Sequence, residues 1–165
     1  MSGARARPRR YWLFKSEPQA YSIHDLAAEP ERTTYWDGVR NYQARNMLRD
    51  EAQVGDRVFF YHSNADPMGI FGTMEIVRAG YPDPTAFDPR DHHFDSKSDP
   101  DDPAWFMVDV RLVQVFPRPV SRDDLRDCRE TAAMKVLARG SRLSIVPVTA
   151  AEWKAVHKLA GVEDV

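Results

Sequence analysis

The sequence is poor in the residues and runs that define several classes of protein. Cys128 is the single cysteine among 165 residues, which excludes an intramolecular disulfide and a cysteine-based zinc site. No hydrophobic run approaches the length of a membrane span, and the N-terminus lacks the charged and then apolar pattern of a signal peptide. We therefore expect a cytoplasmic protein that contacts no membrane and folds in a reducing compartment.

Basic charge is also scarce once the N-terminus is set aside. Residues 1–10 carry four arginines and no acid, so residues 11–165 hold the remaining 19 of 23 basic residues against 25 acidic ones, a net charge of −6. This balance disfavours the broad basic surface typical of sequence-independent nucleic-acid binding, although a small pocket with local arginines remains open. We expect residues 1–10 to be a disordered basic arm and residues 11–165 to be a single domain.

Several motifs of cofactor and enzyme chemistry are missing. The sequence has no GxxxxGKS or GxGxxG loop for phosphates, no GxSxG turn for a nucleophilic serine, and no HExxH or CxxC metal pair. The long polar segment 81–103 does contain His92, His93 and Asp95, but adjacent histidines in a loop are poorly constrained as ligands. We expect a solvated loop, no metal and no cofactor. A protein-binding role is weaker because the loop lacks a cluster of aromatic anchors.

The hydrophobic pattern predicts a mainly β protein of the α+β class. Capping boxes predict short helices after Ser22, Ser121 and Thr149. Because strands and helices do not alternate as a doubly wound sheet requires, we expect a small, partly closed barrel with peripheral helices. Strands are expected at residues 11–14, 57–61, 69–77, 105–116 and 143–148, with an antiparallel hairpin over 57–77 and a further helix over 44–52.

One stretch, residues 35–49, combines aromatic, flexible and polar residues. Trp36 is followed by Gly38, which can adopt a positive φ, and then by Arg40 and Asn41 where a helical pattern begins. An indole on one side and a guanidinium and an amide on the other could hold a flat polar ligand. The alternative is a simple helix entry with a core tryptophan.

Polar groups also end two of the predicted strands. Lys15, Ser16 and Glu17 follow the first strand, and His62 and Ser63 follow the first strand of the hairpin. Polar groups on such a rigid mount suit ligand contact, and the alternative is that both are solvated strand ends.

Five motifs follow one another along the chain: YWLFKSEP, WDGVRNYQARN, GDRVFFYHS, HHFDSKSDPDDPAWFMVDV and RGSRLSIVPVT. In this order they resemble the motifs of EVE domain proteins, close to the thymocyte nuclear protein family and within the PUA-like barrel superfamily. The resemblance covers residues 11–161 and implies a five- or six-stranded pseudo-barrel with one pocket, which recognises a modified base in DNA or RNA.

The resemblance implies a pocket to which four segments contribute. A base must leave its stack to be read in this way, and Trp36 would supply the aromatic face that receives it. Asn41 and Ser63 can donate and accept hydrogen bonds at a base edge. Arg40 and Lys15 could meet phosphate. The implied ligand-binding residues are Lys15, Ser16, Glu17, Trp36, Val39, Arg40, Asn41, Tyr61, His62, Ser63, Arg139, Ser141, Arg142 and Leu143.

The alternative function is an enzyme that acts on a nucleobase or nucleotide, with Glu17 and His62 as its general acid and base. The sequence offers no nucleophile with an orienting partner, because Cys128 lies in a stretch rich in Asp and Arg. We therefore expect a monomeric binding module that performs no chemistry.

Overall fold

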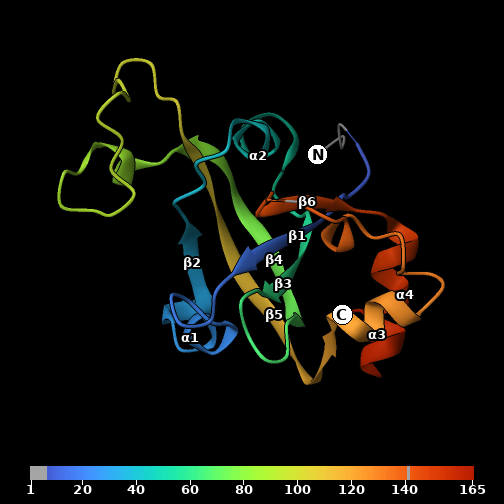
Figure 1. Ribbon diagram of the computed structural model, residues 1–165. Helices are drawn as coiled ribbons and strands as arrows, with labels where there is room; N and C mark the ends of the chain where they lie inside the picture. Colours follow the sequence, from blue (N-terminus) through green and yellow to red (C-terminus); the bar gives the residue numbers. More distant parts are fainter. Residues whose placement is uncertain (1–6, 141) are drawn as a thin grey trace, which may run out of the picture.

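The computed structural model describes residues 7–140 and 142–165. Its six strands form one mixed sheet with the spatial order β2-β5-β4-β3-β1-β6, surrounded by short helices (Figure 1). The strands are β1 (Tyr11–Ser16), β2 (Thr33–Trp36), β3 (Arg57–His62), β4 (Gly69–Pro82), β5 (Phe106–Ser121) and β6 (Ile145–Val148). The α-helices are α1 (Ile23–Ala27), α2 (Tyr42–Asn46), α3 (Arg122–Asp127) and α4 (Ala150–Ala160). Shorter turns are 3-10 helices at η1 (Pro30–Arg32), η3 (Pro84–Phe87) and η4 (Lys135–Leu137), and a π-helical turn, η2 (Met47–Glu51), that continues α2.

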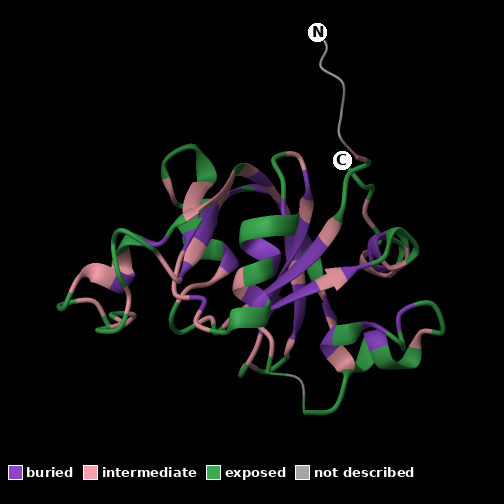
Figure 2. Cartoon of the chain, turned by 90° about the horizontal axis from the view of Figure 1, so that it is seen from above, coloured by how far each residue is buried: buried purple, intermediate pink, exposed green. Residues whose placement is uncertain are grey.

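Both faces of the central strands are buried. Side chains alternate along β1, so Trp12 and Phe14 join one hydrophobic cluster, the first core, while Leu13 joins another, the second core. The first core also contains Trp36 of β2, whereas the second contains Trp153 of α4. Figure 2 shows the buried residues concentrated along the strands. The sheet therefore separates two cores rather than covering one.

The sheet is rolled, and Trp36 gives the evidence. Strand β2 lies at one end of the hydrogen-bonded order and β1 lies four strands away, a separation of about 19 Å in a flat sheet. Yet the Trp36 ring centroid is 5.4 Å from that of Phe14 in β1 and 5.4 Å from that of Phe60 in β3. The expected partly closed, PUA-like barrel of the α+β class is confirmed.

Glycines allow the strands to approach closely where the sheet bends. A methyl group on Gly69 would lie 2.3 Å from the carbonyl oxygen of Val120, and one on Gly72 would lie 2.3 Å from that of Gln114. The pairing of β4 with β5 shifts its register between Ile70 and Gly72. Side chains at these glycines would push the two long strands apart.

The strand boundaries differ from the sequence prediction at several places. Strands β1 and β4 run past their expected ends at residues 14 and 77, to Ser16 and Pro82, and the largest differences are at β2 and β5. Strand β2 was not predicted, because its four residues lie beside a turn and pair only with β5. Strand β5 continues to Ser121, although Pro117 and Pro119 were expected to end it. Both prolines fall between the pairs Val115–Gly72 and Val120–Ile70, where the ladder is interrupted and no N–H donor is needed.

All three predicted capping boxes are present, at Ser22–Asp25, Ser121–Asp124 and Thr149–Glu152. Helix α4 ends at Gly161, which has a φ of 71° as a left-handed C-terminal cap requires. No helix within residues 7–140 and 142–165 combines the length and the hydrophobicity needed to cross a membrane.

The folded part begins earlier than the boundary expected after residue 10. The Arg7 guanidinium donates hydrogen bonds of 3.1 and 2.9 Å to the carboxylate of Asp56, which also accepts one of 3.0 Å from the Trp12 indole. Asp56 is buried, and these donors together lower its pKa although burial opposes them. Arg7 is thus anchored to the domain, while residues 1–6 of the expected arm lie outside the described part.

Candidate functional site

A cleft of about 340 Å³ opens at the seam of the rolled sheet, where β2 faces the end of β1 without pairing to it. Its walls come from the two strand ends, from the segment between them and from the loop that follows η3. The lining residues are Lys15, Ser16, Ala20, Tyr21, Glu29, Thr34, Tyr35, Trp36, Asp37, His92 and His93.

Trp36 is both a core residue and part of the cleft. Only 8% of its surface is exposed, and its ring packs against Phe14 and Phe60 of the first core. Tyr21 meets it edge-on at 6.5 Å with an interplanar angle of 89°. Because several aromatic contacts fix the indole, the surface it presents to the cleft is rigid.

Hydrogen bonds fix the wall formed by Tyr21. Its hydroxyl donates a hydrogen bond of 2.8 Å to Glu29, and its carbonyl oxygen accepts one of 2.6 Å from the Ser16 hydroxyl. Burial, reinforced by the Glu29 carboxylate, raises the pKa of the Tyr21 hydroxyl, which therefore stays protonated. The second carboxylate oxygen of Glu29 is left to accept a further hydrogen bond.

Lys15 lies at the edge of the cleft. It aligns with Tyr61 in the parallel pairing of β1 and β3, and the alternation of β1 directs its side chain to the same face as Leu13. Burial lowers the pKa of Lys15, and the nearby Arg122 guanidinium lowers it further. Lys15 therefore borders the cleft, with its ammonium on the side of Arg122.

The opposite wall contains Asp37 and His93. The His93 ring rests on Gly38, which has a φ of +78°, and a methyl group there would lie 2.4 Å from Nε2 of that ring. Burial raises the pKa of Asp37, although His93 acts in the opposite direction. The Nδ1 atom of His93 lies 3.6 Å from Oδ2 of Asp37 and 3.3 Å from Oδ1 of Asp91.

Arg40 supports this wall instead of facing the cleft. Its guanidinium donates a hydrogen bond of 3.0 Å to the buried carboxylate of Asp83 and one of 2.7 Å to the backbone carbonyl of His93. Asp83 also accepts a hydrogen bond of 2.9 Å from the Gly38 backbone. The expectation that Arg40 meets phosphate is therefore wrong in this structure, because its donors already hold the loop against the sheet.

The neighbours of Arg40 also have structural roles. Asn41 caps α2, its side-chain oxygen accepting a hydrogen bond of 3.0 Å from the backbone of Ala44. Val39 is buried in the first core. Neither residue lines the cleft. The predicted segment thus contributes Trp36 to the site, and the residues that follow it fix the local backbone.

The hairpin end is not the opposite wall that the sequence suggested. Tyr61 points into the second core, and burial raises the pKa of its hydroxyl. His62 accepts a hydrogen bond of 3.1 Å at Nε2 from the backbone of Ile23, and burial, aided by His24, lowers its pKa to about 4. Ser63 reaches this region through its backbone, which donates to the carbonyl of Ser16 at 3.0 Å.

The proposed acid and base of the alternative function are not assembled. The Glu17 carboxylate is exposed and accepts a hydrogen bond of 3.1 Å from Asn64, whereas the His62 ring is buried and holds the start of α1. In the late turn, Arg139 and Arg142 are exposed away from the cleft lining, and Leu143 packs against both cores. Ser141 lies outside the described residues.

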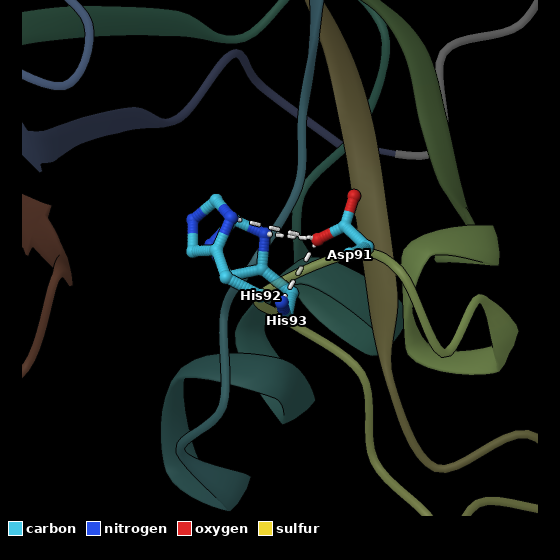
Figure 3. A group of neighbouring side chains, drawn as sticks. All are labelled: Asp91, His92 and His93. Atoms are coloured by element: carbon cyan, nitrogen blue, oxygen red, sulfur yellow. Dashed lines mark hydrogen bonds and ion pairs between the residues drawn. The ribbon is translucent and has the colours of Figure 1, made fainter.

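Among the predicted site residues, Lys15, Ser16 and Trp36 line the cleft. Sequence reasoning missed Tyr21, Glu29 and Thr34, which lie in none of the five motifs, and Asp37, which lies in the WDGVRNYQARN motif but was not singled out. The position of Asp37 beside Trp36 was the signal that could have found it. The histidines of the 81–103 segment were noticed but grouped with Asp95, which instead accepts a hydrogen bond of 2.7 Å from the Trp105 indole. Figure 3 shows that Asp91 is the acid beside His92 and His93.

Known proteins resemble this chain both in sequence and in fold. The EVE domain family matches residues 10–159. Rat thymocyte nuclear protein 1 is 42% identical over 170 aligned residues, which cover 93% of this chain and 74% of that protein. A solved Pseudomonas putida protein is 47% identical with a TM-score of 0.86, covering 91% of this chain and 99% of its own.

A second solved structure contains nucleic acid. The human THYN1 protein, in complex with DNA that contains 5-methylcytosine, is 41% identical with a TM-score of 0.86, over 94% of this chain and 99% of that chain. Sequence and fold therefore agree over nearly the whole length, and the chain belongs to the EVE domain family.

Proposed function

We propose that this protein is a nucleic-acid-binding module that recognises a modified base in the cleft over Trp36, with 5-methylcytosine in DNA as the first candidate. The observation that carries the proposal is the rigid indole at the seam of the sheet, with polar groups around it. The human relative solved with 5-methylcytosine-containing DNA shares this fold at 41% identity, which supports DNA over RNA as the polymer.

A base could enter the cleft only after leaving its stack or from a single strand. Stacking on the indole of Trp36 would contribute about 1–3 kcal/mol. The Glu29 carboxylate, fixed by Tyr21, suits the exocyclic amino group of a cytosine, which donates hydrogen bonds. The hydroxyl of Thr34 lies in the same lining and offers a second polar contact.

Discrimination of the methyl group would rest on burial alone. Removing one methyl group from water contributes about 0.8 kcal/mol, which corresponds to roughly a fourfold difference in affinity. Preference for the methylated base should therefore be modest unless the methyl group also fills a space that the unmodified base leaves open.

We also propose that binding involves no chemical reaction and that the protein acts as a cytoplasmic monomer. Within the described residues, Glu17 and His62 do not meet, and His62 already accepts a backbone hydrogen bond. This arrangement favours a binding module over an acid–base enzyme.

The experiment is a binding titration with labelled single-stranded oligonucleotides that differ only in one 5-methyl group. We expect tighter binding of the methylated strand, and weaker binding of both strands by Glu29→Gln, because an amide would present a donor to the donor group of the base. Glu31→Gln, at an exposed residue outside the cleft, is the matched control. Equal affinity for both strands, unchanged by Glu29→Gln, would contradict the proposal.

A further inference from the structure

We propose that Asp91, His92 and His93 bind a divalent transition-metal cation of the zinc class in the wall of the cleft. One ligand atom from each residue lies within 4.8 Å of the other two. Figure 3 shows the Asp91 carboxylate directed toward both imidazole rings. This departs from the expectation of no metal, which rested on the poor constraint of adjacent histidines in a loop and on the lack of an HExxH or CxxC pair.

The central atom of this arrangement is Nδ1 of His93. It lies 3.3 Å from Oδ1 of Asp91 and 3.6 Å from Oδ2 of Asp37. The atom is buried and has no hydrogen-bond partner within the described part of the chain. A buried ring nitrogen between two carboxylates, without a hydrogen bond to either, is costly unless something satisfies it.

The distances fit the edges of a zinc coordination polyhedron. Zinc bonds of 2.0–2.2 Å to imidazole nitrogen and carboxylate oxygen place tetrahedral ligand atoms about 3.4 Å apart. Oδ1 of Asp91 is 3.3 Å from Nδ1 of His93 and 3.8 Å from Nδ1 of His92. Small rotations of these side chains would bring all three atoms to one ion.

Three contacts hold the ligands in place from behind. The backbone N–H of His93 donates a hydrogen bond of 2.8 Å to Oδ1 of Asp91, which orients that carboxylate. Arg40 binds the backbone carbonyl of His93 at 2.7 Å, and Gly38 leaves room for the His93 ring. Outer contacts of this kind orient the ligands at protein metal sites.

The donor set indicates the class of ion. Two imidazoles and one carboxylate suit zinc and its neighbours among the transition metals, whereas magnesium and calcium prefer oxygen ligands throughout. Three protein ligands also leave a coordination position open. His92 and His93 both line the cleft, so that position would be accessible from it.

A cation here would assist the proposed binding of nucleic acid. Of the points that favour the metal site, this one alone rests on the proposed function. Asp37 and Asp91 place two carboxylates beside a cleft proposed to receive nucleic acid, in a chain of net charge −2. A divalent ion would offset both charges and reduce their repulsion of a phosphate backbone.

The test is calorimetric titration of the full, tag-free chain, first stripped of metal with a chelator, with zinc chloride and with magnesium chloride. We expect one saturable zinc site per chain and no comparable magnesium site. His92→Ala should weaken zinc binding at least tenfold, and the His92 side chain is 85% exposed, so its loss should leave the melting temperature unchanged. His24→Ala, at another exposed histidine, is the matched control and should bind zinc as the wild type does.

Cobalt supplies a second readout, because the visible absorption of bound Co²⁺ reports its ligand geometry. A spectrum typical of tetrahedral or five-coordinate cobalt, lost in His92→Ala and His93→Gln, would support the site. No saturable zinc binding, or equal zinc binding by wild type and His92→Ala, would overturn it and would leave an ordinary histidine–carboxylate ion pair. Oligonucleotide binding measured in the presence of chelator separates the two proposals, because it tests the cleft without the ion.

Discussion

Trp36 and Trp153 are both buried tryptophans on opposite sides of the same sheet, but their rings are enclosed to different degrees. Trp153 is 2% exposed, and its ring stacks on Phe59 at 4.1 Å and on Tyr11 at 4.8 Å. Trp36 meets its aromatic neighbours at a tilt or edge-on, and the cleft adjoins it. The second core therefore uses its indole to fasten α4 to the sheet, whereas the first core leaves part of an indole available at the seam.

The difference follows from what covers each face. Helix α4 packs Trp153 and Val156 onto the second core, and its capping box and C-terminal glycine fix its length. Near Trp36 the covering segments are the short α1, whose Ile23 N–H donates a hydrogen bond to His62, and the loop after η3, to which Arg40 donates one. Polar contacts to backbone position these pieces without filling the space over the ring. A cleft can persist there because close packing is incomplete.

The largest expected effect is that of Trp153→Ala on stability. Loss of a large buried aromatic side chain costs about 3–5 kcal/mol, which for a protein of this size lowers the melting temperature by roughly 6–20 °C. Trp36→Ala should cost less, because part of that ring faces the cleft and loses fewer packing neighbours. Thermal melts of the two variants make the measurement. Equal losses would mean that the two rings are equally enclosed, and the comparison would fail.

Acid should lower the stability of the folded protein through His62, which holds the start of α1. Its pKa is about 4 in the folded protein, against an ordinary value of 6.5, so the unfolded chain binds the proton more tightly. Stability is therefore full above pH 6.5, falls as the pH decreases toward 4, and has lost about 3 kcal/mol below that. The physical cause is that protonation of Nε2 removes the acceptor for the Ile23 backbone and charges a buried ring.

Urea unfolding at pH 7.5 and pH 5 measures this effect. His62→Leu is the control, because it removes the titrating group: it should be less stable at pH 7.5, where the Ile23 N–H loses its acceptor, and should show a smaller fall in stability between the two values. A fall as large as that of the wild type would assign the acid sensitivity to other groups.

The sequence predicted the framework of the fold better than the site. Capping boxes at Ser22, Ser121 and Thr149 were correct because each depends on residues three apart in the chain. The cleft depends on β2 meeting the end of β1 after the sheet rolls, a contact that no local pattern encodes. Trp36 was found because an aromatic two residues before a glycine is conspicuous, whereas Glu29 joins the site through its place in the lining and its hydrogen bond from Tyr21.

Arg40 illustrates the opposite error, in which a residue that was predicted to contact the ligand has a structural role. A guanidinium in the same short segment as Trp36 suggested a phosphate contact, but its partner, Asp83, lies 43 residues further along the chain. That pairing becomes visible only when the loop after β4 folds back onto the sheet. Residue type therefore indicated polar chemistry at this position, and tertiary structure decided that the chemistry is internal.

A middle-sized effect is expected for Trp36→Ala on binding. If the indole stacks a base, its loss should weaken oligonucleotide binding by about 1–3 kcal/mol, or roughly 5- to 150-fold. Tyr42→Ala is the control, because Tyr42 is an exposed aromatic outside the cleft that stacks on Trp105. Fluorescence anisotropy with a labelled strand measures both variants. Equal weakening by the two would place the contact outside the cleft.

The smallest expected effect is that of Gly38→Ala, at the glycine on which the His93 ring of the cleft wall rests. Gly38→Ala must hold a side chain at a φ of +78°, which costs about 1–2 kcal/mol, and its methyl group would meet the His93 ring at 2.4 Å. Gly161→Ala, at a φ of +71° with nothing within 4 Å of the added methyl group, should carry the backbone cost alone. The difference between the two melts therefore reports the packing of His93 against the sheet. If that packing shapes the cleft, Gly38→Ala should also weaken oligonucleotide binding while Gly161→Ala leaves it unchanged; equal behaviour of the two would show that the His93 wall yields without affecting the ligand.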